Sequence, residues 1–140
     1  MRCFAWILLP LLLVLSACFA PISSEPTVVT NANGFSESMR WGDFPTAAFY
    51  LHPDVREDFK SKFVDGDSAL HIVESQVLTA DLHEDEGWAE TVYEMEYFRL
   101  PSGQVKKWRW SQHWKVEKDG PLSSANWLID NAPPAVPWTP

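Results

Sequence analysis

The chain has 140 residues, a formal net charge of −8 and 46% hydrophobic residues. This length suits one small domain. The acidic balance excludes DNA or RNA binding, which requires a basic face.

The first 17 residues form a charged start and an apolar run. Arg2 carries their charge, and the run ends in the small residues Ser16-Ala17. The run is shorter than the roughly 20 residues that a membrane-spanning helix needs. The pattern therefore predicts a signal peptide over residues 1–17, whose removal leaves 10 basic and 19 acidic residues, a net charge of −9.

The end of this run, Leu15-Ser16-Ala17-Cys18, resembles the lipobox of bacterial lipoproteins. The resemblance implies that Cys18 is lipidated, begins the mature chain and anchors it in a membrane, since several acyl chains hold firmly. In enterobacterial lipoproteins a residue other than aspartate after the cysteine, here Phe19, implies the outer membrane, facing the periplasm. The alternative is an ordinary secretory signal with a chance cysteine. Cys3 leaves with the signal, so no thiol remains for a disulfide, a metal site or a nucleophile.

Two low-periodicity segments flank the predicted domain. Residues 18–35 are rich in proline, serine, threonine and asparagine, which predicts a flexible tether. Residues 131–140 contain four prolines and predict an extended tail that Trp138 pins to the body. The domain is therefore expected over residues 36–130.

A helical pattern covers residues 36–63. Ser36 is expected to cap a short helix over 37–41, and Asp43 to cap a second helix with Pro45 in its first turn. Pro53 interrupts this pattern, and Asp54 is expected to cap a further helix that reaches Phe63.

Alternation of period two follows Gly66 and predicts strands. Residues 89–99 and 105–116 alternate cleanly around a turn signal at 101–104. A tight turn at Ser102-Gly103 pairs Tyr93 with Gln112, Glu96 with Arg109 and Met95 with Trp110, which sets aromatic residues on one face and charges on the other. A less regular strand over 69–82 precedes this hairpin, and a last strand over 125–130 follows it.

Helices followed by a four-stranded meander predict an α+β domain, with N-terminal helices packed on a curved antiparallel sheet. The segment 40–59 and the later "RWSQHWKVEKDG" and "WLID" are similar to the NTF2-like (cystatin-like) fold. In that family the sheet and helices enclose a cone that binds small molecules, supports isomerase or dehydratase chemistry, or is simply packed. The resemblance implies a fold and no particular activity.

The candidate ligand site lies on the aromatic face of the sheet. If the first strand pairs so that Gln76 faces Met95, polar groups enter an apolar concavity, as in small-molecule sites. A bulge or a one-residue shift would turn them to water instead. Gln112, which lies between Trp110 and Trp114 on the same strand, is a companion polar group to Glu74 and Gln76. The predicted site comprises six side chains: Glu74, Gln76, Tyr93, Tyr97, Trp110 and Gln112. The tryptophans beside them can cradle a flat ligand or form core.

Other polar residues predict no catalytic group, metal or cofactor. His113 is expected in a solvated cross-strand pair, although it could act as a general base. The histidines share no metal-ligand spacing, and the acidic run 83–86 lacks the ligand alternation of a calcium loop.

The sequence therefore favours a lipid-anchored, non-catalytic domain that binds a protein partner or a small ligand through its sheet. One alternative is a small enzyme with an acid or base, such as Glu74, in a pocket of the aromatic face. Another is an inhibitor or immunity-like protein that uses its loops.

Overall fold

The computed structural model describes residues 27–118 and 125–138. Within these residues, helices come first and strands follow, in the order α2 (Val28–Arg40), α3 (Phe44–Ala48), α4 (Pro53–Lys62), β1 (Leu70–His83), β2 (Trp88–Arg99), β3 (Ser102–Glu117) and β4 (Asn126–Ile129). The signal peptide, Cys18 and the first part of the predicted tether lie outside the described residues. None of the described helices is long and apolar enough to cross a membrane.

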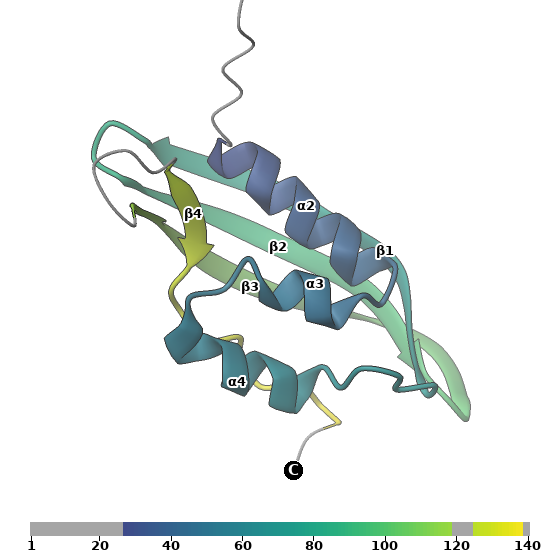
Figure 1. Cartoon of the computed structure of the whole chain (residues 1–140). Helices are drawn as coiled ribbons and strands as arrows, with labels where there is room; N and C mark the ends of the chain where they lie inside the picture. The colour runs from purple at the N-terminus through teal and green to yellow at the C-terminus, as the bar shows by residue number, and fades with distance from the viewer. Residues whose placement is uncertain (1–26, 119–124, 139–140) are drawn as a thin grey trace, which may run out of the picture.

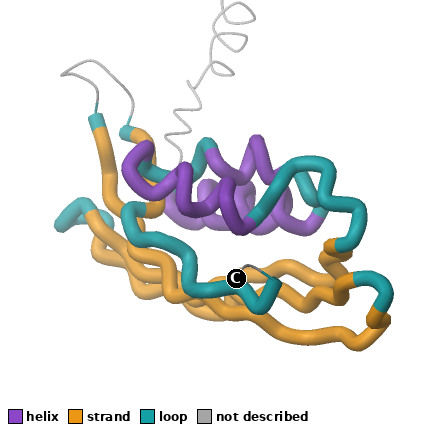
Figure 2. Tube along the Cα trace, turned by 90° about the horizontal axis from the view of Figure 1, so that it is seen from below, coloured by secondary structure: helices purple, strands orange, loops and turns teal. Residues whose placement is uncertain are grey.

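The four strands form one antiparallel meander in the order β1-β2-β3-β4. Figure 1 shows the helices lying across the curved sheet, and Figure 2 shows them gathered on one face of it. The predicted α+β architecture is therefore confirmed. We call the helix-covered side of the sheet the inner face and the opposite side the outer face.

Helix α2 begins well before the predicted start at residue 37. Thr27 is its N-cap, and the Thr27 hydroxyl accepts a hydrogen bond from the backbone N–H of Thr30 at 3.2 Å. The prediction that residues 28–35 belong to the tether is wrong. Val28, Ala32, Phe35 and Met39 form a buried stripe at helical spacing, and burial of this stripe outweighs the weak helix propensity of the intervening glycine and asparagines.

One glycine in α2 has a packing role. A Cβ atom on Gly34 would lie 2.3 Å from the hydroxyl oxygen of Tyr50, which follows α3. The absence of a side chain at Gly34 therefore allows the helix and the Tyr50 ring to approach closely.

Helix α3 begins next to a proline, and helix α4 begins at one. Asp43 caps α3 as predicted, accepting from the backbone N–H of Thr46 at 3.1 Å. The predicted Asp54 cap of α4 is wrong, because α4 begins at Pro53 and His52 is its N-cap. The Nδ1 atom of His52 accepts from the Asp54 backbone N–H at 3.3 Å.

In the β2–β3 hairpin the side chains lie on the predicted faces of the sheet, but the two strands pair in a different register. Tyr93 pairs with Trp110, Met95 with Trp108 and Glu94 with Arg109, two residues away from the expected partners on β3. Ser102 and Gly103, expected as the turn, belong to β3, and Arg99 pairs with Ser102 around Leu100-Pro101. A shift of two residues preserves the faces because side chains alternate with period two.

The pairing of β1 with β2 contains two irregularities, one between Ile72 and Glu74 and one between Val77 and Thr79. Ser75 pairs with Met95 and is buried, whereas Gln76 pairs with Glu94 and is exposed. The predicted pairing of Gln76 with Met95 is therefore wrong, and the shifted register carries Gln76 away from the aromatic face.

The core lies between the helices and the inner face. Phe35 is at its centre, with ring centroids 5.2 Å from Tyr93, 5.9 Å from Trp110 and 6.1 Å from Phe59. The tail joins this core as expected, because the Trp138 Nε1 donates to the Lys62 carbonyl at 2.9 Å. Helices, sheet and tail thus share one core.

Candidate binding site

The six side chains of the predicted ligand site do not converge. Tyr93, Trp110 and Gln112 are buried in the core, and none of the surface hollows described below is lined by them. Tyr97 borders a small hollow of about 90 Å³ beside Trp138. The aromatic face is therefore filled by the helices rather than open to a ligand.

The other two residues of the predicted site, Glu74 and Gln76 of β1, point away from that core. Glu74 forms an ion pair with Arg40 of α2 at 3.3 Å, and its side chain is 43% exposed. Gln76 lines a groove of about 500 Å³ between α2 and β1, with Ser36 and Trp41. These positions agree with the alternative in which an irregular register turns both groups toward water.

Gln112 is part of a buried hydrogen-bond chain. Its Oε1 accepts from the Thr91 hydroxyl at 2.9 Å, and that hydroxyl accepts from the Trp114 Nε1 at 2.9 Å. The Nε2 of Gln112 and the Nε1 of Trp110 have no hydrogen-bond partner among residues 27–118 and 125–138. Gln112 thus contributes to packing and to a polar contact inside the core.

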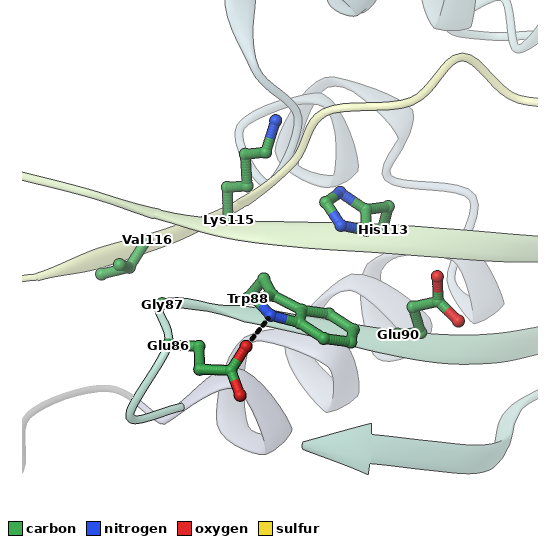
Figure 3. Close-up of a pocket in the computed structure, with 7 residues that line it drawn as sticks. All are labelled: Glu86, Gly87, Trp88, Glu90, His113, Lys115 and Val116. Atoms are coloured by element: carbon green, nitrogen blue, oxygen red, sulfur yellow. Dashed lines mark hydrogen bonds between the residues drawn. The ribbon is translucent and has the colours of Figure 1, made fainter. Parts of the chain in front are cut away.

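A larger hollow, of about 580 Å³, lies at one end of the outer face. We call it the Trp88 hollow. It is formed by the start of β2, the end of β3 and the turn before β2, and its lining comprises Glu86, Gly87, Trp88, Glu90, His113, Lys115 and Val116 (Figure 3).

The indole of Trp88 is the large apolar surface of this hollow. Trp88 is partly exposed, and the ring of His83 stacks on it with centroids 3.8 Å apart and an interplanar angle of 13°. The Trp88 Nε1 donates to the Glu86 carboxylate at 3.0 Å. Figure 3 shows the indole between the carboxylates of Glu86 and Glu90. The ring is thus fixed in place with acidic groups on both sides.

The opposite wall of the hollow holds a compact ion cluster. Asp130 contacts the Lys115 ammonium at 2.6 Å and the His113 Nδ1 at 2.7 Å. Partial burial opposes ionisation of Asp130, but the hydrogen bonds from Lys115 and His113 prevail and lower its pKa. The hydrogen bond to Asp130 raises the pKa of Lys115. Lys115 is therefore already neutralised by Asp130.

The titratable side chains in the lining of the hollow are Glu86, Glu90, His113 and Lys115. His113 is oriented by Asp130, as a general base would be, but none of the described lining residues supplies a hydroxyl or thiol nucleophile. No group of three His, Cys, Asp or Glu side chains in the described part of the chain is arranged to hold a metal ion.

Sequence reasoning missed Trp88. The sequence nevertheless contained a signal for it. Trp88 alternates with the even-numbered residues of β2, which carry mostly charged side chains, and so it lies on the face opposite the core. A single aromatic residue on a protein surface is common, and Trp88 becomes a binding candidate because it lies in a hollow with polar groups. No protein-family model and no curated protein matches the chain.

Proposed function

We propose that this chain is a lipid-anchored, exported lipoprotein whose NTF2-like domain binds a protein partner through the outer face of its sheet, without catalysis. The lipobox-like Leu15-Ser16-Ala17-Cys18 supports the anchor, and helices followed by a meander support the family. Phe19 supports placement at the outer membrane, facing the periplasm.

The observation that carries the binding proposal is the contrast between the two faces. The inner face is closed, with Trp114 and Tyr93 at 0% exposure and Trp110 at 2%. The outer face holds a hollow with a partly exposed indole. An enzyme with an acid or base on the aromatic face needs a solvent-reached cavity there, and this packing speaks against one.

The start of α2 limits the distance between the anchor and the domain. Nine residue steps separate Cys18 from the cap residue Thr27. A fully extended chain spans at most about 3.4 Å per residue, so the tether reaches roughly 30 Å. We therefore expect the domain to meet partners close to the membrane surface.

Cys18→Ser tests the anchor. We expect the wild-type protein to fractionate with membranes and to resist extraction by high salt, and the variant to appear in the soluble fraction with unchanged circular dichroism. A variant that stays in the membrane fraction with the wild type would contradict the proposal.

A photo-reactive cross-linker tests the binding face. We would place it at Ser111, which is exposed on the outer face between Arg109 and His113, and at Glu57, which is exposed on α4. We expect a discrete adduct from position 111 in intact cells and none from position 57. Equal adducts from both positions, or none from position 111, would contradict binding through the outer face.

A further inference from the structure

We propose that the Trp88 hollow receives a lysine or arginine side chain from a basic segment of the protein partner. This inference rests on the proposed function and adds the chemistry of the partner. It follows from the indole, from the charges around the hollow and from the acidity of the whole domain.

The Trp88 indole makes the first contribution to binding a cation. The face of a tryptophan ring attracts a cation within about 6 Å of its centroid. His83 covers one face of the Trp88 ring, with centroids 3.8 Å apart, and the His113 ring lies nearly parallel to it at 6.1 Å. A cation would therefore approach the part of the indole that stays exposed in the hollow, while the bond from its Nε1 to Glu86 holds the ring in position. The partner's cation would therefore meet a preorganised surface, which limits the entropy lost on binding.

The charges around the hollow make the second contribution to binding a cation. Among the described residues, no lysine or arginine pairs with Glu86 or Glu90. The lysine of the lining, Lys115, is already bound to Asp130. The turn before β2 adds Glu84 and Asp85, neither of which has an ion-pair partner in the described ranges. The hollow therefore has an unbalanced negative charge.

On the rest of the outer face, in contrast, the acidic side chains are paired with basic ones. Glu94 is bound by Arg109 and Lys107, and Lys107 also contacts Glu96 at 2.8 Å. Charges in the middle of the face are thus paired with each other, whereas Glu90 at the hollow has no ion-pair partner among the described residues, and Glu86 has none that is a lysine or arginine. A net charge of −9 after removal of residues 1–17 further favours approach of a basic partner.

The test measures binding of a fluorescent lysine–glycine pentapeptide to the mature, lipidated protein in neutral detergent. A glutamate–glycine peptide of the same length is the comparison probe. We expect anisotropy to report binding of the lysine peptide and none of the glutamate peptide. The affinity should fall as ionic strength rises from about 0.02 to 0.2 M, because exposed charges are screened.

Variants locate the binding on the hollow. Trp88→Leu should weaken binding about two- to thirtyfold, the range expected for a lost cation–π contact. Glu90→Gln should weaken it about two- to fivefold without altering the fold. The matched controls are Trp41→Leu, which alters an indole that is 77% exposed on the helical side, and Glu57→Gln on α4. Both controls should leave binding unchanged.

Each other outcome overturns the inference. Equal binding of the two peptides, or equal losses in the controls, would show that the hollow does not select cations. Binding of free ethylamine as tightly as of the peptide would replace the protein partner with a small amine. If the cross-linker at Ser111 captures a partner while the lysine peptide fails to bind, the outer face stands and the cationic partner is wrong. If both fail, the proposed function itself is wrong.

Discussion

A buried polar cluster around Ser75 links three elements of the core. The Ser75 hydroxyl lies 2.7 Å from the Tyr93 hydroxyl and 2.8 Å from the Ser36 carbonyl, so it links β1, β2 and α2. Burial raises the pKa of Tyr93 more than the bond to Ser75 lowers it, so the phenol stays protonated. A cluster of this kind stabilises the fold when every member finds a partner.

Ser75→Ala tests the contribution of this cluster. The substitution removes the contact of the Tyr93 hydroxyl with Ser75 and leaves that buried group unsatisfied, so we expect the free energy of unfolding to fall by about 1–3 kcal/mol. Urea denaturation measures the change. Ser111→Ala on the exposed outer face is the control and should alter stability by less than about 0.5 kcal/mol. Equal effects from both substitutions would show that the cluster contributes nothing.

Glu94 predicts a dependence of stability on pH. Its hydrogen bond to Arg109 is the main cause of a lowered pKa, and the bond to Lys107 adds to it. Because the pKa is lower in the folded state than the ordinary 4.5, Glu94 stabilises the fold above that pH and loses this effect as pH falls through the folded value.

Chemical denaturation between neutral and acidic pH checks this prediction. Glu94→Gln should reduce the loss of stability below about pH 4.5 relative to the wild type, since the substituted residue no longer titrates. Glu57→Gln, which alters an exposed residue of α4, is the control. Identical pH profiles for wild type and Glu94→Gln would contradict the assignment.

At the scale of elements, periodicity predicted the kind of each element better than its limits. The four strands, and the faces of β2 and β3, followed from alternation, because the side chains of a half-buried strand face core and solvent in turn. The faces of β1 did not, because its pairing with β2 contains two irregularities. The hairpin register did not, since a shift of two residues leaves every face unchanged and Ser102-Gly103 is a turn signal that the chain places inside β3. The start of α2 was missed because its burial depends on a sheet distant in sequence.

Truncation tests the corrected limit of α2. A chain that begins at Glu25 keeps the buried stripe from Val28 to Met39, whereas one that begins at Ser36 loses Val28, Ala32 and Phe35. We expect the first chain to unfold cooperatively and the second to lack a cooperative transition, because loss of a fully buried aromatic residue alone costs about 3–5 kcal/mol. Equal thermal transitions for the two chains would return residues 28–35 to the tether.

At the scale of the whole molecule, core and candidate site lie on opposite faces of one sheet. The sequence predicted the fold class and the aromatic face, but it placed the ligand site on that face because polar residues such as Gln112 are interspersed among the aromatics. Tertiary packing decided for the alternative in which the aromatic residues form core: α2 and α4 bring Phe35 and Phe59 onto the inner face and fill it. The outer face is left to bind. Alternation separates the aromatic face from the charged one, but it does not report whether the helices leave an open pocket on the aromatic face.

The central claim is that the outer face, at the Trp88 hollow, is occupied by a partner in the cell. Hydroxyl-radical footprinting of the wild-type protein compares the oxidation of Trp88 in intact cell envelopes with that in the purified protein, using the exposed Trp41 as the internal reference. The account predicts that Trp88 is protected in envelopes while Trp41 is oxidised equally in both samples. Equal oxidation of Trp88 in the two samples would contradict it.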